Sequence, residues 1–357
     1  MNNKKSVTIK EVAELANVSS MTVSRVLNDE SLVKNSTRVK VNSAIKALNY
    51  RPNVMAQKLA GGQGLFISLM YRNPSPAYFT EMLLGALNVC CEKGFYLVVD
   101  KPTMSEDLVS IDHLEKRFQK SGIQAVMLAP PLSDDRELIS TINRLGISHV
   151  CISPGEVIPD EPCVRMNDEA AAYDMTNFLF DLGHEKIAFI QGPRDHSASH
   201  LRLDGFLNAM KDKNITLDKK YISQGDFTYL SGIHAATSLL KECKNITAIF
   251  ACNDDMAAGA IAAVNQAGLK VPEDISVTGF DDTHSATFVW PPLTTVRQPI
   301  KEMGECAIEL ITQKLSKKPE EISDIFLNHE IIVRGSTSVS KNRKPKAVKV
   351  QSLSDSI

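Results

Sequence analysis

Three absences narrow the classes of protein to which this sequence can belong. The seven cysteines are scattered and no two have the C-x-x-C spacing, which argues against a disulfide framework and against a zinc ribbon. No apolar run approaches the roughly 18 residues of a membrane-spanning helix. No G-x-x-x-x-G-K-[S/T] run occurs, which excludes a P-loop kinase. We therefore expect a soluble, cytoplasmic protein that does not contact membranes.

Charge is distributed unevenly along the 357 residues. Residues 1–62 contain ten Lys and Arg but only four Asp and Glu, whereas the whole chain has a net charge of −2. The remaining residues are therefore acidic. At roughly 100–200 residues per domain, the chain is long enough for two or three domains. A small basic head before a larger acidic body indicates that the head meets a polyanion.

Apolar spacing predicts three short helices in the basic head. In residues 8–16 apolar side chains recur at i, i+3, i+4 and i+7, and Thr8 and Glu11 have the spacing of a capping box. A second helix is predicted over residues 20–28 and a third over residues 36–48. Three helices around so small a core form a unit whose second helix can enter a DNA major groove.

The outer face of the predicted second helix carries the candidate DNA contacts. Arg25 is suited to a bidentate contact with guanine, and Ser20 and Met21 would lie against neighbouring base edges. Thr22 and Ser24 are more suited to phosphates, which position a protein without specifying sequence. The periodicity alone is equally compatible with an ordinary helical subdomain that has a solvated face.

The body shows short apolar runs that alternate with helical stretches, for example at residues 95–99, 125–129 and 246–252. This alternation is typical of βαβ units, in which helices cover parallel sheets. The expected fold class is therefore α/β, with an all-α head followed by two doubly wound parallel-sheet lobes. A ligand would bind at the carboxyl ends of the strands, in the crevice between the lobes.

The strings TIKEVAELANVSSMTVSRVLN and YRPNVMAQKLAGG closely resemble the DNA-binding head of the LacI/GalR family of bacterial transcription regulators. The resemblance implies a helix-turn-helix domain at residues 1–50 and a hinge helix with linker at residues 51–62. It also implies that Leu59 enters the minor groove as a wedge. The hinge is too short to be helical alone in water, so it should fold on DNA. The expected DNA-binding residues are Thr8, Ser19, Ser20, Met21, Thr22, Ser24, Arg25, Asn28, Tyr50, Asn53, Leu59 and Ala60.

Residues 63–338 resemble the effector-binding and dimerisation domain of the same family, which is similar to periplasmic sugar-binding proteins. The resemblance implies that the chain crosses between the lobes near Cys163, Pro292 and Ser323. The implied effector-binding residues are Tyr78, Phe79, His196, Arg202, Phe227, Asn253, Asp281 and Gln298, with Tyr71 and Ser153 as weaker candidates. Arginine and aspartate can bind vicinal hydroxyls, and aromatic faces can stack on a pyranose, so these residue types suit a carbohydrate.

The expected function is sequence-specific transcription regulation, as a repressor of carbohydrate catabolism or uptake genes. The expected partners are a pseudo-palindromic operator in double-stranded DNA, a sugar-like effector and a second copy of the chain. Residues 339–357 lack leucine heptads, so we expect a disordered tail and a homodimer without a tetramer-forming helix. The sequence leaves open whether the ligand releases the operator or strengthens binding to it.

Several alternatives remain open at this point. A nucleobase between Tyr78 and Phe79 would replace the sugar, and an architectural protein would bind DNA without sequence preference. The pairs at 254–255 and 281–282 could mark a sugar-processing enzyme, but adjacent residues on a strand end usually point apart. His196 and His200 lack a third metal ligand, so we expect no metal, no cofactor and no catalysis.

Overall fold

The computed structural model describes residues 8–27, 33–48, 50, 64–102, 104–105, 108–156, 161–315 and 323–341. Internal contacts divide the chain into two units, with the boundary between Leu65 and Phe66. No helix among the described residues combines the length and apolar character that crossing a membrane requires. All seven cysteines are free thiols.

The head consists of three helices around a small apolar core. These are α1 (Ile9–Ala16), α2 (Ser20–Leu27) and α3 (Asn35–Ala47). The predicted capping box is confirmed: the Thr8 backbone N–H donates to Glu11 Oε2 at 2.6 Å, and the Glu11 N–H donates to Thr8 Oγ1 at 3.4 Å. The buried core brings together side chains from all three helices: Val12, Ala13, Ala16, Val23, Val26, Val41 and Ala44.

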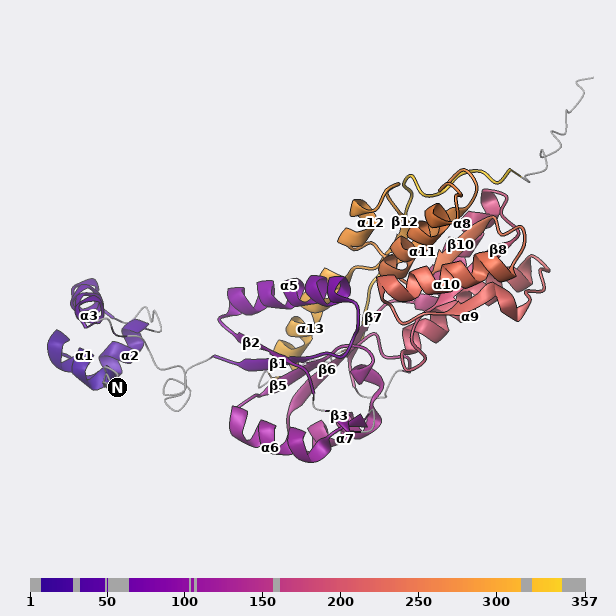
Figure 1. The fold of residues 1–357 in the computed structure, drawn as a ribbon. Coiled ribbons are helices and arrows are strands. Elements are labelled where there is room, and N and C mark those ends of the chain that lie inside the picture. Colours follow the sequence, from indigo (N-terminus) through magenta and orange to yellow (C-terminus); the bar gives the residue numbers. More distant parts are fainter. Residues whose placement is uncertain are drawn as a thin grey trace, which may run out of the picture. The chain divides into compact units, whose positions relative to one another are not determined.

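The first lobe of the body is a parallel six-stranded sheet in the order β13-β7-β6-β5-β1-β2. Its strands are β1 (Phe66–Met70), β2 (Tyr96–Asp100), β5 (Ala125–Leu128), β6 (Ser148–Ile152), β7 (Cys163–Arg165) and β13 (Ile325–Phe326). The helices on its two faces are α5 (Pro76–Lys93) with α13 (Ile300–Lys314), and α6 (Ile111–Ser121) with α7 (Arg136–Arg144), as Figure 1 shows. Two short strands, β3 (Met104–Ser105) and β4 (Leu108–Val109), pair with each other.

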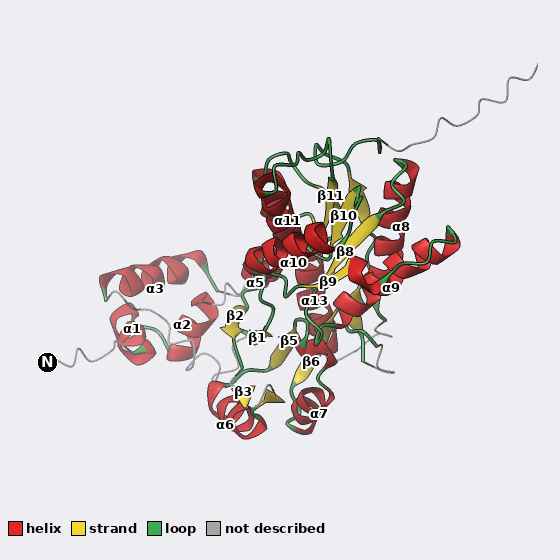
Figure 2. Ribbon diagram, turned by 45° about the vertical axis from the view of Figure 1, so that its right-hand side comes forward, coloured by secondary structure: helices red, strands yellow, loops and turns green. Residues whose placement is uncertain are grey.

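The second lobe repeats this architecture with a sheet in the order β14-β12-β11-β10-β8-β9, in which β14 alone is antiparallel to its neighbour. Its strands are β8 (Ile187–Gln191), β9 (Ile222–Gln224), β10 (Ala248–Ala251), β11 (Ser276–Asp281), β12 (Thr294–Arg297) and β14 (Glu330–Ile332). Its helices are α8 (Asp168–Asp181), α9 (Ser197–Asp212), α10 (Tyr229–Glu242), α11 (Asp254–Gln266) and α12 (His284–Phe288). Figure 2 shows α8 and α9 on one side of this sheet and α10 and α11 on the other. The predicted α/β fold class is confirmed.

The chain crosses between the lobes three times, and one predicted crossing is wrong. We expected a crossing near Pro292, but β12 (Thr294–Arg297) still pairs with β11 in the second sheet. The crossing lies at Gln298 and Pro299, directly before α13 packs on α5 in the first lobe. The reason is that the Pro291–Pro292 pair precedes a buried strand and does not end the lobe. The third crossing follows Phe326, a few residues after the predicted position.

Candidate functional site

The carboxyl ends of strands from both lobes meet at a small cavity. Parallel strands direct their carboxyl ends to one edge of a sheet, and loops at these ends carry the binding residues of open α/β folds. The residues that line this cavity are Asn73, Ser75, Tyr78, Pro130, Ser153, Asp168, His196, Ala198, Arg202, Phe227, Asn253, Asp281 and Gln298.

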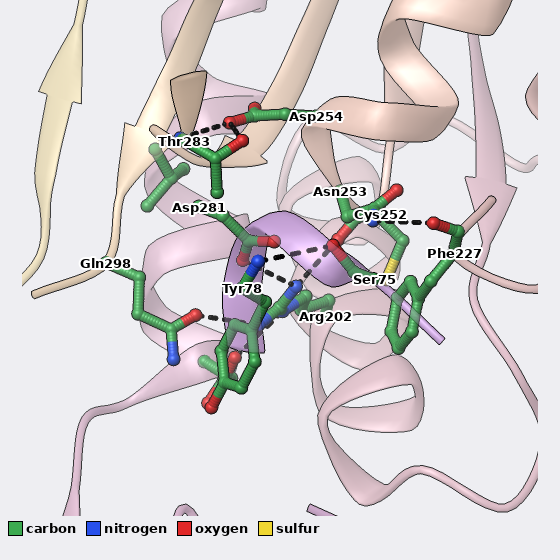
Figure 3. A network of polar contacts seen from close by, with 12 residues as sticks. Ser75, Tyr78, Arg202, Phe227, Cys252, Asn253, Asp254, Asp281, Thr283 and Gln298 are labelled. Atoms are coloured by element: carbon green, nitrogen blue, oxygen red, sulfur yellow. Dashed lines mark hydrogen bonds and ion pairs between the residues drawn. The ribbon is translucent and has the colours of Figure 1, made fainter. Parts of the chain in front are cut away.

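Arg202 on α9 is the central polar group of the cavity and is only 4% exposed. Its Nε donates to Asp168 Oδ1 at 2.8 Å, and its Nη1 donates to the Cys252 carbonyl at 2.7 Å. Nη2 donates to Gln298 Oε1 at 3.1 Å, and Asp281 Oδ1 lies 3.5 Å from Nη1. Figure 3 shows the Arg202 side chain beside Cys252, Asp281 and Gln298. Burial of a charge is costly unless it is paired, and here the pairing is extensive.

Two aspartates on the second lobe have pKa values raised by burial. The pKa of Asp281 rises to about 7 because desolvation outweighs the nearby Arg202 charge. The pKa of Asp254 is raised well above its usual value, since it is fully buried and close to Asp281. Asp254 accepts from the Thr283 N–H at 2.8 Å and from Thr295 Oγ1 at 2.6 Å, so its role is to hold the strand ends around Asp281 (Figure 3).

Asn253 and Phe227 form another wall of the cavity. Asn253 caps α11, because its Oδ1 accepts from the Met256 N–H at 2.9 Å, and its Nδ2 donates to the Phe227 carbonyl at 3.1 Å. Gly192 leaves room for the Phe227 ring, which a Cβ at that position would overlap. Ser153, Phe227 and Asp281 all have positive φ angles, of 43°, 67° and 112°. Backbone strain of this kind concentrates at functional sites.

The first lobe contributes uncharged groups to the lining. Tyr78 lies in the first turn of α5 and is 5% exposed, and burial raises the pKa of its phenol well above the ordinary value. Ser75 caps α5 and also donates to Asp255 Oδ2 of the second lobe at 2.9 Å. Ser153 Oγ contacts the Met303 sulfur at 3.9 Å. The carboxylates and the guanidinium of the cavity therefore all belong to the second lobe.

His196 lies at the amino end of α9 and is 3% exposed. Its Nδ1 lies 3.0 Å from Asp195 Oδ1, and its ring meets Phe227 edge to face at 5.3 Å between centroids. Burial lowers the pKa of His196 more strongly than the Asp195 carboxylate raises it. The imidazole is consequently neutral at pH 7, with the proton on the nitrogen that faces the carboxylate.

The structure places seven of the eight predicted effector residues, all but Phe79, at this one cavity. The exception stacks on Tyr71, with ring centroids 4.0 Å apart, and is not among the lining residues. Of the weaker candidates, Ser153 lines the cavity. Sequence reasoning missed Asp168, Asn73, Ser75, Pro130 and Ala198. Asp168 had a usable signal, because it starts a helix shortly after the strand that ends at Arg165.

In the head, α2 buries Val23 and Val26 and exposes the residues expected to contact bases. Met21 is 66% exposed and Arg25 is also exposed, whereas Ser20 is half-buried. This arrangement agrees with the two predicted faces of the helix.

Two further residues predicted to contact DNA form hydrogen bonds with each other at the start of α2. The Ser19 and Thr22 hydroxyls lie 2.9 Å apart, and the Thr22 N–H donates to Ser19 Oγ at 3.1 Å. Tyr50 packs against the head core. The predicted contacts that lie outside the described residues are Asn28, Asn53, Leu59 and Ala60.

The carboxyl groups of Asp254 and Asp282 are engaged in hydrogen bonds and ion pairs. Asp254 is held by three donors, and Asp282 is bound by Arg297 at 2.8 Å and Arg334 at 2.6 Å. His200 Nε2 lies 2.8 Å from the Arg194 carbonyl. Among the described residues, no three His, Cys, Asp or Glu side chains gather as metal ligands would. The cavity can bind and orient a polar molecule, and its charged groups are engaged with one another.

Comparison with known proteins finds a match in the head and another in the body. Residues 8–53 match the family described as bacterial regulatory proteins, lacI family, and residues 176–337 match the periplasmic binding protein-like domain. The chain is 33% identical over 331 residues to the HTH-type transcriptional repressor PurR of Histophilus somni (strain 129Pt), with 92% of this chain and 98% of that protein covered.

Two further matches extend the comparison. The chain is 33% identical over 330 residues to the ribose operon repressor of Escherichia coli (strain K12), with 92% of this chain and 99% of that protein covered. The solved structure of the Lac repressor dimer bound to operator and the anti-inducer ONPF has a TM-score of 0.80 at 29% identity. That match covers 94% of this chain and 100% of the other.

Proposed function

The chain belongs to the LacI family of bacterial regulatory proteins, and from this premise we propose that it is a repressor whose affinity for operator DNA depends on a small ligand between its lobes. The observation that carries the proposal is the cavity around Arg202, which lies where both lobes present their strand ends. The α2 helix of the head supplies the exposed surface for the major groove.

We propose that the ligand is a carbohydrate and that the regulated genes serve sugar uptake or catabolism. The cavity combines hydrogen-bonding side chains such as Arg202 and Asp281 with the aromatic ring of Phe227, as a pyranose or furanose requires. One relative is named as the repressor of a ribose operon, and ribose is a carbohydrate. A nucleobase between Tyr78 and Phe79 has less support, because Phe79 stacks on Tyr71 outside the lining.

Control follows from a shared equilibrium between two lobe arrangements. A ligand that binds one arrangement more tightly shifts the population toward it by its differential binding free energy. If that arrangement changes how two hinges meet the operator, DNA affinity changes by the same coupling, typically about 1–3 kcal/mol or roughly 5–150-fold. The lobes are already linked across the cavity by Ser75 to Asp255 at 2.9 Å and Ser197 to Asp134 at 2.6 Å.

We further propose that the chain acts as a homodimer on a pseudo-palindromic operator. The second lobe exposes large apolar side chains that no described residue covers, with Phe288 and Trp290 each 82% exposed and Leu230 64% exposed. Exposed apolar groups of this size mark association surfaces. A two-fold symmetric dimer would place two heads on two half-sites.

The test is selection of the operator followed by titration with ligands. Full-length protein would select duplexes from a random pool, and the selected sites should be pseudo-palindromes whose binding weakens steeply with salt. Free sugars would then be titrated against the complex. The variant Gln298→Met keeps the side-chain length but removes the polar atoms that contact Arg202, so it should retain operator affinity and lose the response.

The matched control for this test is Gln313→Met, on the exposed side of α13. It should behave as the parent protein in both measurements. Selection that yields no sequence preference would show an architectural DNA-binding protein. A parent protein whose operator affinity ignores every sugar that binds it would contradict the proposed control.

A further inference from the structure

The cavity offers acceptors and compensated charges, and these features select one class of ligand. We propose that it binds an uncharged ligand that donates hydrogen bonds, one of them to His196 Nε2, so that free sugars bind and their phosphate esters do not. The inference rests on the proposed function, because it specifies the ligand of the same site. Three independent features support it.

The first feature is that the guanidinium of the cavity is already engaged. Arg202 donates to Asp168, to the Cys252 carbonyl and to Gln298, and it lies 3.6 Å above the Phe280 ring. An anion would need a cation that is not already paired, because a buried charge without compensation is unfavourable. Among the described lining residues, Arg202 is the one Lys or Arg side chain.

The second feature is a carboxyl group at four of the helix amino ends around the cavity. Asp168 and Asp254 lie in the first turns of α8 and α11. At α9, Ser197 Oγ donates to Asp134 Oδ2 at 2.6 Å, and at α5, Ser75 Oγ donates to Asp255 Oδ2 at 2.9 Å. Helix amino ends attract anions such as phosphate. Here each of these positions already has a carboxyl group. Asp168, which pairs with Arg202, lines the cavity itself, so a phosphate ester would meet repulsion there.

The third feature is the unpartnered nitrogen of His196. Its Nδ1 faces Asp195, whereas Nε2 is buried and has no hydrogen-bond partner among the described residues. A proton on Nδ1 leaves Nε2 as an acceptor. A buried acceptor without a partner costs free energy, which a hydroxyl of the ligand would recover. His196 therefore acts as a specificity residue for a donor on the ligand.

The tautomer of His196 is linked to closure of the lobes. Asp195, which fixes the proton on Nδ1, forms an ion pair with Arg72 in the loop after β1 of the first lobe. The charged groups around the imidazole are thus Asp195, Arg72 and Arg202. The pair across the cleft gives the Asp195 carboxylate a further contact, which would be lost if the lobes separated. The acceptor is consequently best ordered in the closed arrangement.

The first experiment compares matched pairs of ligands on the full-length chain. Calorimetry would use ribose against ribose 5-phosphate, glucose against glucose 6-phosphate, and fructose against fructose 1-phosphate, with galactose, maltose, cellobiose and hypoxanthine added. We expect at least one uncharged compound to bind and each phosphate ester to bind at least tenfold more weakly than its parent sugar. A phosphate ester that binds more tightly than its parent overturns the proposal, as does a panel in which no uncharged compound binds.

The second experiment observes the imidazole directly by nitrogen NMR with labelled histidine. At pH 7 we expect an unprotonated Nε2 and a protonated Nδ1 on His196, and we expect the Nε2 resonance to shift when the bound sugar is added. The variant His196→Gln assigns the signal. A protonated Nε2, or a resonance that ignores the ligand, overturns the assignment of His196.

Variants distinguish a specific role of His196 in sugar binding from a general loss of structure. His196→Phe keeps a ring but removes the acceptor, so sugar affinity should fall about tenfold or more. The control His200→Phe changes an exposed histidine whose Nε2 faces the Arg194 carbonyl, and its affinity should match the parent. Operator affinity is measured separately. Sugar binding that leaves operator affinity unchanged would contradict the proposed function alone, whereas control by a phosphate ester would contradict this inference alone.

Discussion

The head and the body place the residues proposed for recognition in opposite environments. In the head, Met21 and Arg25 are exposed on α2, and the core behind them is a small cluster around Val12, Val23 and Val41. In the body, Arg202 and Asp281 are each 4% exposed and are held by partners on several elements. Recognition in the head depends on what the surface presents, while recognition in the body depends on groups that the fold has already ordered.

The difference has an energetic consequence. A side chain on the surface of α2 can be replaced with little effect on folding, since such substitutions usually change stability by at most about 0.5 kcal/mol. One member of a buried ion pair cannot be replaced without a large effect on folding, because its removal leaves the charge of the other member without compensation. Mutations in the head should therefore change DNA binding without changing the free energy of unfolding. Mutations of the buried charges in the body should change both ligand binding and the free energy of unfolding.

The largest effect is expected for Arg202→Ala. It leaves Asp168 and Asp281 buried without their cation, so the free energy of unfolding of the body should fall by about 3–5 kcal/mol. Urea denaturation of the full-length protein measures this change. The control Arg297→Ala removes a guanidinium that is 48% exposed and should cost less than about 1 kcal/mol. Equal losses in the two variants would remove the contrast between buried and exposed charges.

A smaller effect, on DNA alone, is expected for Arg25→Ala. Loss of a bidentate contact to guanine should weaken operator binding by about 1–3 kcal/mol and relax the preference at one base pair. The free energy of unfolding should be unchanged, because Arg25 is exposed. Binding to the selected operator and to its single-base variants measures the effect. Uniform weakening on all sequences would place Arg25 on a phosphate instead.

The smallest effect is a pH dependence of sugar binding. Because burial lowers the pKa of His196 below its ordinary 6.5, the ring is neutral at pH 7 and becomes protonated only as the pH falls further. Protonation converts the Nε2 acceptor into a donor, so affinity should fall toward low pH, by at most about tenfold at pH 5.5. Calorimetry with the uncharged sugar that binds measures it. His196→Gln should lack this component, and an identical pH profile in the two proteins would contradict it.

Local features of the fold could be predicted from the sequence to a large extent. The capping box of Thr8 and Glu11 involves residues three positions apart, and apolar spacing gave the head helices to within a residue or two. The alternation of strands and helices predicted two parallel-sheet lobes because it is a local pattern repeated along the chain. The crossing near Pro292 was wrong, since sheet membership of Thr294–Arg297 depends on pairing with a distant strand.

The site was predictable in its residues but not in their contacts. Resemblance to a family indicated Arg202, Asp281 and Gln298, which the structure brings to one cavity. It also indicated Phe79, whose ring turns to Tyr71 because the two lie side by side at the end of β1 and the start of α5. Asp168 was missed, although it provides the shortest charged contact of Arg202 with a carboxylate.

The amino-acid sequence by itself determined the basic head and the alternating body, because charge, periodicity and local capping act over a few residues. The family followed from the resemblance of the head sequence to known regulators. Tertiary structure alone decided how Arg202 is held, since its partners lie 34, 50, 79 and 96 positions away along the chain. Tertiary structure alone also left His196 Nε2 without a hydrogen-bond partner among the residues that the structure describes. Burial and pairing are properties of groups that only folding brings together, and the choice of ligand depends on both.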